Sequence, residues 1–383
     1  MSDDAPEPDQ IDGAPHPRAT ARLIGQSAAE AAFLDAYNTG RLHHGWLITG
    51  PRGIGKATLA WKIARFLLAT PENDGGMFAP PPPATLDIPD SNPISRRLAA
   101  LSESRLHLVR RTPHPETGTM RQVITVGDIR GEHRRSAKYL SEFLQLSAAD
   151  GGRRVAIIDC ADEMNPNAAN ALLKLLEEPP AKVTILLISH QPGRLLPTIR
   201  SRCRELRLQA LSPADLADAL TQAGGEVDPN DRIALAELAG GSVGEAFRLT
   251  NLDGLKLYAA LIRILASMPR LDRPLAQALA ESGSGRGNEP RFDLIVTLID
   301  LFLARLARAG TLHALPPEAA KGEAALIERL APTADIARHW ADLAQSLGVR
   351  ARRGKAVNLD PAALLMDMVL KIDETAGMLA QRV

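Results

Sequence analysis

The chain has 383 residues, a length that predicts two or three domains. Of these residues 45% are hydrophobic and 23% are charged, a composition typical of a soluble globular protein. Lys and Arg total 45 and Asp and Glu total 45, so the formal net charge is zero, whereas a protein that binds DNA mainly through its charge would be more basic. The two cysteines, Cys160 and Cys203, exclude a disulfide framework and a four-cysteine zinc site within the chain.

No run of apolar residues reaches the length of a membrane span, and the N-terminus lacks the basic and then apolar pattern of a signal peptide. We therefore expect a cytoplasmic protein that does not enter a membrane. Residues 1–20 are rich in Pro, Asp and Ala, lack periodicity and carry five acidic residues against one arginine, Arg18. This composition predicts a disordered acidic tail.

Short apolar runs that predict strands alternate with helical patterns over residues 42–208. The expected strands cover 44–49, 105–110, 154–159, 183–189 and 203–208, and the expected helices cover 59–68, 127–146 and 168–176. Because these strands are apolar on both faces, we expect an α/β fold with a parallel sheet that helices cover on both sides. Residues 71–93 include four consecutive prolines and predict a surface insertion, since proline breaks helices and central strands.

Only helical patterns follow residue 208. Ser212 and Pro213 are typical of a helix cap and a first helical residue, and they open a short helical unit that ends near residue 252. A stretch rich in Gly, Ser and Asn at 282–290 interrupts the helices that follow. We expect three domains, over residues 21–208, 209–252 and 253–383.

A glycine-rich turn, GPRGIGKA at 50–57, follows the first predicted strand and opens a helix. It is nearly the phosphate-binding loop G-x-x-x-x-G-K-[ST], in which glycines turn backbone N–H groups toward phosphates and the helix N-terminus adds positive potential. Lys56 would reach the β- and γ-phosphates. The candidate nucleotide-binding residues are Gly50, Gly53, Gly55, Lys56, Thr58 and, at the end of a later strand, Asp159.

Two positions of this site lack the residues that ATP hydrolysis uses. Ala57 stands where a Ser or Thr binds Mg²⁺, and Thr58 is a poor substitute because a helix turns by about 100° per residue. Asp159 ends its strand in the Walker B pattern, in which the aspartate steadies Mg²⁺. Cys160 follows it, at the position where hydrolysing proteins with this pattern have a glutamate that polarises water. Asp162 and Glu163 lie just past the end of this strand, and either is a weak replacement for the missing glutamate. We expect no intrinsic ATPase activity, while residual binding of ATP or ADP stays open.

These residues are similar to those of the AAA+ subunits of bacterial DNA polymerase III clamp loaders. The similar segments are LIGQ at 23–26, GRLHH at 40–44, the loop at 50–57, NAANALLK at 167–174, LEEPP at 176–180 and LLPTIRSRC at 195–203. The resemblance is dense over about residues 21–252 and looser beyond. It implies an AAA+ P-loop NTPase-like core, a small helical lid over 209–252 and an all-α collar domain over 253–383.

Within this family, the chain resembles the delta-prime branch, whose nucleotide sites are degraded. In the lid, Gly244 stands where the ATPase subunits have a nucleotide-sensing arginine. Many family members carry a four-cysteine zinc module after the first helix, but this chain has its proline-rich insertion there and no cysteine. We therefore predict no zinc and no required cofactor.

The family's Ser-Arg-Cys motif is present at Ser201, Arg202 and Cys203. The resemblance implies that Arg202 is an arginine finger that acts in trans on ATP bound to a neighbouring subunit, where it stabilises the charge of phosphoryl transfer. Spacing alone favours a solvated basic strand start, because Arg200, Arg202 and Arg204 alternate. The motif assigns the finger to Arg202 and leaves the other two as surface residues.

For the other basic residues, a position on the solvated surface is an alternative to a functional contact. Lys174 lies on the helix that faces DNA in relatives, but a surface lysine explains it equally. Two further groups could contact DNA or a partner, and a solvated helix face or end also explains them: Arg130, Arg134, Arg135 and Lys138, and Arg350, Arg352, Arg353 and Lys355. We expect no metal at His43 and His44, because adjacent side chains face opposite ways and no third ligand is placed.

The resemblance implies an assembly subunit that supports loading of the sliding clamp onto primed DNA during replication. Its partners would be tau- or gamma-type ATPase subunits and a delta subunit. A self-sufficient AAA+ ATPase with a divergent site is the alternative, against which Ala57, Cys160 and Gly244 count. A third hypothesis is a nucleotide-binding sensor without partners.

Overall fold

The structure is a computed structural model of the chain, and it describes residues 7, 10–20, 22–71, 81–114, 116–130, 140–145 and 152–381. The chain forms two compact units, Met1–Gly225 and Glu226–Val383. Their boundary falls inside the segment 209–252 that the sequence assigns to one small helical domain. The predicted domain limits at 208 and 252 stay predictions.

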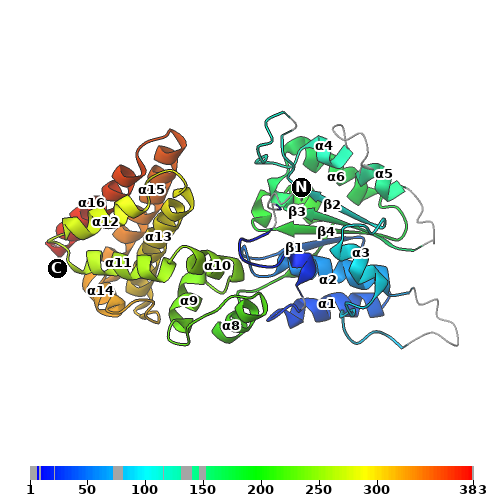
Figure 1. The fold of residues 1–383 in the computed structure, drawn as a ribbon, viewed down its shortest axis with the longest axis horizontal. Helices are drawn as coiled ribbons and strands as arrows, with labels where there is room; N and C mark the ends of the chain where they lie inside the picture. The colour runs from blue at the N-terminus through cyan, green and yellow to red at the C-terminus, as the bar shows by residue number, and fades with distance from the viewer. Residues whose placement is uncertain are drawn as a thin grey trace. The chain divides into compact units, whose positions relative to one another are not determined.

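The first unit is built on a sheet of five parallel strands in the order β2-β3-β4-β1-β5 (Figure 1). The strands are β1 (Gly45–Thr49), β2 (Leu106–Arg110), β3 (Arg154–Asp159), β4 (Val183–Ser189) and β5 (Arg204–Arg207). The α/β fold and all five predicted strands are therefore confirmed. The central strands β1 and β4 are buried along their whole length, because helices cover both faces of the sheet.

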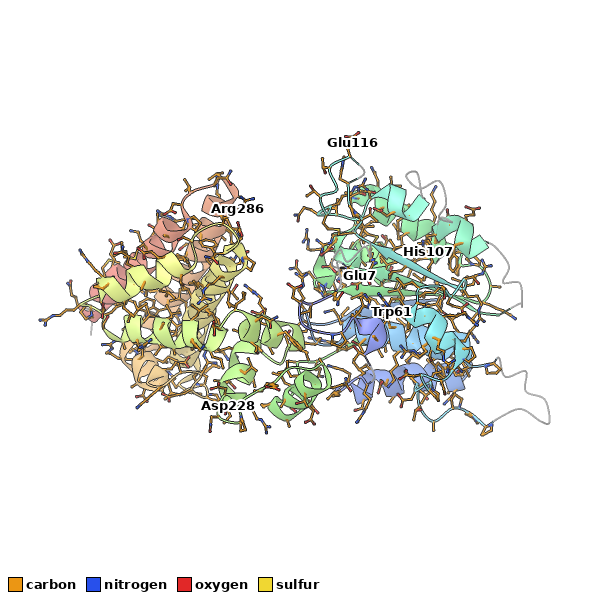
Figure 2. The ribbon with its side chains drawn as sticks, viewed as in Figure 1. Glu7, Trp61, His107, Glu116, Asp228 and Arg286 are labelled. Carbon is orange, nitrogen blue, oxygen red and sulfur yellow. The ribbon has the colours of Figure 1, made fainter. Side chains whose placement is uncertain are left out.

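Alternate residues of each strand face two different cores. In β3, Val155 and Ile157 pack with α1 (Ser27–Asn38), α2 (Lys56–Ala69) and α3 (Pro93–Ala99). Trp61 of α2 is fully buried in this core (Figure 2). Ala156 and Ile158 pack on the opposite face. The helices of that face are α4 (Val126–Arg130), α5 (Leu140–Gln145), α6 (Pro166–Glu177) and α7 (Pro197–Arg200), and α8 (Pro213–Gln222) follows β5.

Local capping explains where several of these helices begin. The Asn165 side chain accepts the Ala168 N–H at 2.8 Å, with Pro166 as the first helical residue of α6. The Ser212 hydroxyl accepts the Asp215 N–H at 3.1 Å at the start of α8, so the predicted cap there is confirmed.

Two predicted segments fall partly outside the described residues. Of the proline-rich insertion at 71–93, residues 72–80 are not described, and residues 81–92 contain neither helix nor strand. The helix predicted at 127–146 corresponds to α4 and α5, with residues 131–139 outside the described part. The basic helix face predicted there therefore lies outside the described side chains.

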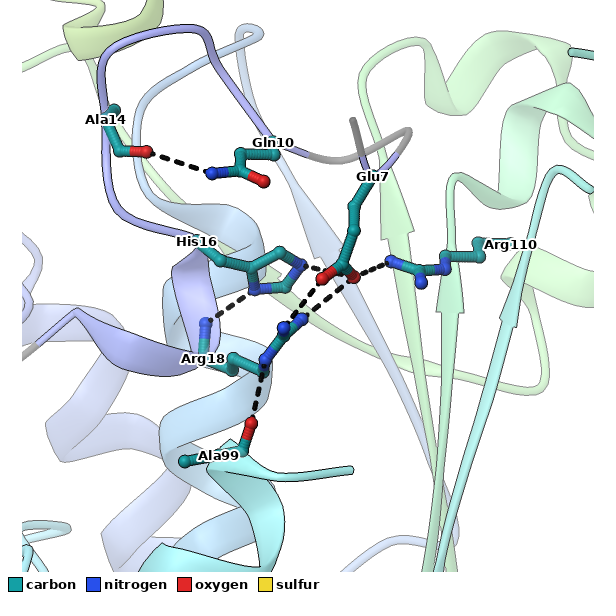
Figure 3. A network of polar contacts seen from close by, with 7 residues as sticks. All are labelled: Glu7, Gln10, Ala14, His16, Arg18, Ala99 and Arg110. Atoms are coloured by element: carbon teal, nitrogen blue, oxygen red, sulfur yellow. Dashed lines mark hydrogen bonds and ion pairs between the residues drawn. The ribbon is translucent and has the colours of Figure 1, made fainter. Parts of the chain in front are cut away.

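The N-terminal segment differs from the disordered tail that its composition predicts. Glu7 and residues 10–20 are placed against the first unit, and a short 3₁₀ turn at Pro17–Ala19 packs on α2. The Glu7 carboxylate accepts two hydrogen bonds from Arg18, at 2.8 and 2.6 Å, and pairs with Arg110 at the end of β2 (Figure 3). His16 is buried edge-on against Trp61. Such single contacts between distant residues create no periodic pattern, so composition misses them.

The ion pairs of Glu7 predict a pH dependence. Hydrogen bonds from Arg18, helped by Arg110 and opposed by burial, lower the pKa of Glu7 from 4.5 to about 2. Their contribution is therefore fully present above pH 4.5 and is lost as the pH falls toward 2. Glu7→Gln should lower the free energy of unfolding by about 1 kcal/mol at pH 7, and the difference should vanish toward pH 2. Urea denaturation at a series of pH values measures it, and a difference that stays constant would contradict the assignment.

The second unit is entirely helical in its described part. Its helices are α9 (Arg232–Ala239), α10 (Val243–Asn251), α11 (Gly254–Ala266), α12 (Arg273–Ser282), α13 (Glu289–Leu312), α14 (Glu323–Leu330), α15 (Ala334–Ala356) and α16 (Pro361–Ala380). The gap between α12 and α13 confirms the predicted interruption near 282–290. None of the described helices is both long and apolar enough to span a membrane.

A buried ionic network ties four of these helices together. Arg305 of α13 donates to Glu323 of α14 at 2.7 Å and to Glu237 of α9 at 2.9 Å. The Tyr258 hydroxyl of α11 donates to the same Glu323 carboxylate at 2.6 Å. Glu323 is 1% exposed, so its charge depends on these donors.

Glu323→Gln should lower the free energy of unfolding of the second unit by about 3 kcal/mol, because it leaves the buried charge of Arg305 without its main partner. Glu328→Gln, an exposed carboxylate on the same helix, is the matched control and should change it by less than about 0.5 kcal/mol. Hydrogen exchange of the α13 and α14 amides measures both. Equal protection in the two variants would show that the network contributes nothing.

Candidate functional site

Three loops meet at the carboxyl edge of the sheet, because β3, β4 and β1 are neighbours and parallel. The glycine-rich loop follows β1, the acidic turn beginning at Cys160 follows β3, and His190 follows β4. The crevice outside the carboxyl ends of such strands is where open α/β sheets bind ligands.

The glycine-rich loop has the geometry of a phosphate-binding loop. Gly50, Gly53 and Gly55 have φ values of +138°, +76° and +98°, which side chains rarely adopt. A Cβ at Gly50 would lie 2.6 Å from the carbonyl oxygen of Leu208, so only glycine fits there. Gly55 is the N-cap residue of α2 and makes no side-chain cap, which leaves the positive end of the helix facing the loop.

Lys56 lies inside this loop. Its side chain is 3% exposed, and its Nζ donates to the carbonyl oxygens of Gly50, at 2.8 Å, and of Pro51. Burial lowers the pKa of Lys56 to about 8, although the nearby groups at the end of β3 counteract this. A buried cation beside a helix N-terminus suits a phosphate group.

The same residues do not suit a bound Mg²⁺. The Ala57 side chain has no oxygen and packs against the apolar core of the first unit. Thr58 is the next residue along α2 and therefore lies about 100° around the helix. Phosphate thus fits the loop, whereas the hydroxyl that normally fixes the metal is missing at its usual position.

The acidic turn after β3 is bound to its own chain. The Cys160 thiol is 4% exposed and donates to an Asp162 carboxylate oxygen at 3.0 Å, and burial raises the pKa of this thiol far above its usual range. Asp162 also accepts the His190 N–H at 2.9 Å, and Glu163 pairs with Arg111 at 2.9 Å. Cys160 therefore stays neutral. Asp162 and Glu163 are each held by partners of their own chain, and these contacts do not place either of them as a base for water.

Two residues that the sequence analysis gave no role help to build this edge. Gln26 is buried, and its amide donates to the carbonyl oxygens of Ile54 and Gln209, at 3.3 and 2.8 Å, joining the phosphate loop to the segment after β5. His190 lies close enough to Lys56 for their charges to interact, and burial, helped by Lys56, lowers its pKa to about 4. His190 is therefore neutral at pH 7.

The Ser-Arg-Cys motif forms the turn between α7 and β5. The Arg202 guanidinium donates to the Thr198 carbonyl oxygen at 3.1 Å and pairs with Glu177 at 3.0 Å, and the side chain remains 36% exposed. Ser201 is exposed, and its hydroxyl also donates to Thr198. Cys203 packs against the core beneath α6, where burial raises its pKa to about 12.

Arg202 lies at the opposite edge of the sheet from the phosphate loop. The motif precedes β5 and lies beside the first residue of β1, since a Cβ at Gly45 would be 3.2 Å from the Arg202 carbonyl oxygen. The phosphate loop follows the last residue of β1, so about 15 Å of strand separates the two sites. The fold therefore keeps Arg202 away from its own loop.

The other arginines of the alternating set differ from Arg202. Arg200 is exposed, and the Arg204 guanidinium lies 5.3 Å from the centroid of the Trp46 ring. Lys174 is exposed on α6, in keeping with either of its two interpretations.

The C-terminal basic run is largely engaged within the helical unit. Arg350 pairs with Asp367 of α16 at 3.0 Å, Arg352 with Asp300 of α13 at 2.6 Å and Lys355 with Asp293 of α13 at 2.7 Å. These pairs favour a structural role over a DNA contact.

The expectation about the histidine pair is wrong in one respect. The rings of His43 and His44 stack, with centroids 4.3 Å apart, rather than face opposite ways. The stack forms because His43 Nδ1 contacts the Gly45 carbonyl oxygen at 2.8 Å and His44 Nε2 contacts that of Leu176 at 3.0 Å. Among the residues that the structure describes, no group of three or more metal-ligand side chains occurs.

Comparisons with known proteins agree with this geometry. A family model described as "DNA polymerase III, delta subunit" matches residues 25–212. The DNA polymerase III subunit delta' of Pseudomonas aeruginosa is 32% identical over 62% of this chain and 65% of its own length, and that of Escherichia coli is 31% identical over 62% and 64%. The Escherichia coli subunit tau is 27% identical over 61% of this chain and 33% of its own length.

The chain spans less than two thirds of the length of these curated relatives. The matched region nevertheless contains the whole five-stranded sheet, the phosphate loop and the Ser-Arg-Cys turn. Over this region the chain is similar to DNA polymerase III subunits, several of which are named delta'.

Proposed function

We propose that the chain is a non-hydrolysing subunit of a DNA polymerase III clamp loader. It supports loading of the sliding clamp onto primed DNA, beside tau- or gamma-type ATPase subunits and a delta subunit. The similarity to subunits named delta' and tau supports this assembly. The observation that carries the proposal is a combination: a phosphate loop without its metal-binding hydroxyl, and a half-exposed arginine at the far edge of the sheet.

The loop accounts for the absence of hydrolysis. ATP hydrolysis needs a cation for the phosphates, a metal ion and a group that polarises water. Lys56 supplies the first, whereas Ala57 cannot ligate the metal and Cys160 is a neutral buried thiol. Residual binding of ATP or ADP through the loop remains compatible with this chemistry, and neither zinc nor another cofactor is required.

The position of Arg202 accounts for a role in trans. It cannot reach the chain's own loop, because the length of β1 separates the two. Its exposed guanidinium can instead approach a γ-phosphate held by a neighbouring subunit and stabilise the charge that phosphoryl transfer develops there. The chain thus completes an active site that it does not contain.

The isolated chain should release phosphate from ATP at less than about one hundredth of the rate of an ATPase subunit with an intact loop. The reason is the loss of both the metal ligand and the water-polarising glutamate. A phosphate-release assay with Mg²⁺ measures this rate. Turnover that is lost in a folded Lys56→Ala variant would instead support a self-sufficient ATPase.

In the reconstituted complex with clamp and primed DNA, Arg202→Ala should lower ATP turnover at the affected site by about tenfold or more. Arg200→Ala is the matched control, because it removes an exposed arginine two residues away, and it should retain the wild-type rate. Gel filtration shows whether each variant still assembles. An assembled Arg202→Ala complex with wild-type turnover would reduce the chain to a passive structural member.

A further inference from the structure

Arg202 has a defined set of partners within its own chain. One terminal nitrogen of its guanidinium donates to the Thr198 carbonyl oxygen at 3.1 Å, and the other pairs with the Glu177 carboxylate at 3.0 Å. These two contacts come from different elements, α7 and the C-terminal end of α6. The guanidinium is therefore oriented before any other molecule approaches it.

Glu177 is held where it meets Arg202. His44 Nε2 contacts the carbonyl oxygen of Leu176 at 3.0 Å, and a Cβ at Gly45 would be 3.1 Å from the Leu176 side chain. The first residues of β1 thus contact both the end of α6 and the Ser-Arg-Cys turn. This close approach brings together two residues that are far apart in the sequence.

Glu177 is an unusual residue for the end of a helix. It is the last residue of α6, where the helix dipole disfavours a negative charge. Pairing with Arg202 offsets this repulsion. Its neighbour Glu178 is also exposed, and it is the C-cap residue of the same helix.

We infer that Glu177 is a positioning residue for Arg202, which holds the guanidinium in the free chain and competes for it with the neighbouring subunit's nucleotide. This inference rests on the proposed function. The pair is suited to exchange, because its side chains are 36% and 47% exposed and such pairs are weak. A triphosphate carries more charge than one carboxylate and accepts the same N–H groups, so it displaces Glu177.

The competition predicts a specific kinetic effect. Each time the neighbour binds ATP, the contact between Arg202 and Glu177 has to break. Removing the Glu177 charge should therefore lower the KM for ATP at that site and leave kcat unchanged, because the bound state with Arg202 on the phosphates is the same. A half-exposed pair can account for about a two- to fivefold change.

The experiment compares Glu177→Gln with Glu178→Gln in the reconstituted complex, each in the wild-type and in the Arg202→Ala background. We expect the KM for ATP to fall about two- to fivefold in Glu177→Gln alone. Glu178→Gln should keep the wild-type KM. In the Arg202→Ala background, Glu177→Gln should have no further effect, because the residue acts only through Arg202.

A second readout uses the chain without its partners. Arginine guanidinium signals in NMR spectra, assigned with Arg202→Lys, should shift for Arg202 in Glu177→Gln and stay in place in Glu178→Gln. An unchanged signal in Glu177→Gln would overturn the pairing itself. An equal KM in the two glutamate variants, or a KM effect that persists without Arg202, would overturn the competition. If Arg202→Ala retains wild-type turnover, the proposed function fails and the competition fails with it.

Discussion

The parallel order of the central strands is the constraint on which the rest of the first unit depends. Because β4 lies between β3 and β1, the loops that leave the three strands meet at one edge. The same direction puts the start of β1 and the turn before β5 at the other edge. One short strand thus has a phosphate loop at its end and an arginine turn at its beginning, and the chain cannot bring the two together.

This separation gives a physical reason for the division of labour that we propose. An arginine finger that acts in trans has to stay away from the nucleotide site of its own subunit. The length of β1 keeps Arg202 away from the chain's own loop. The loop has the backbone geometry and the buried lysine that suit phosphate, while Ala57 packs against the core and Cys160 is a buried thiol that donates to Asp162. The loop therefore has the backbone and the lysine of a phosphate site, but it lacks the metal-binding hydroxyl and the water-polarising glutamate.

Much of the first unit could be predicted from its sequence, because long apolar runs define strands and glycines at fixed spacing define the loop. The start of α8 and the interruption before α13 also follow from local signals, a Ser-Pro cap and a run of Gly, Ser and Asn. Contacts between distant residues could not be predicted. Glu7 with Arg110, Arg202 with Glu177 and Arg305 with Glu323 are single pairs that leave no periodic trace.

The sequence also misled in instructive ways. The histidine pair was expected to diverge, but backbone carbonyl oxygens on β1 and α6 hold the two rings in a stack. The acidic N-terminal tail was expected to be disordered and solvated. Glu7 instead pairs with Arg18 and Arg110, two contacts that composition alone does not predict. In both cases tertiary contacts outweigh the local preference.

The most direct test of the central claim is a structure of the assembled complex with ADP and beryllium fluoride, which mimics the γ-phosphate. Our account predicts the Arg202 guanidinium within about 3 Å of the fluoride atoms in the neighbouring subunit's site, released from Glu177. It also predicts no Mg²⁺–nucleotide complex in the chain's own loop, where Ala57 and Cys160 replace the residues that hydrolysis uses. An Arg202 still paired with Glu177 beside an occupied neighbouring site would contradict the account.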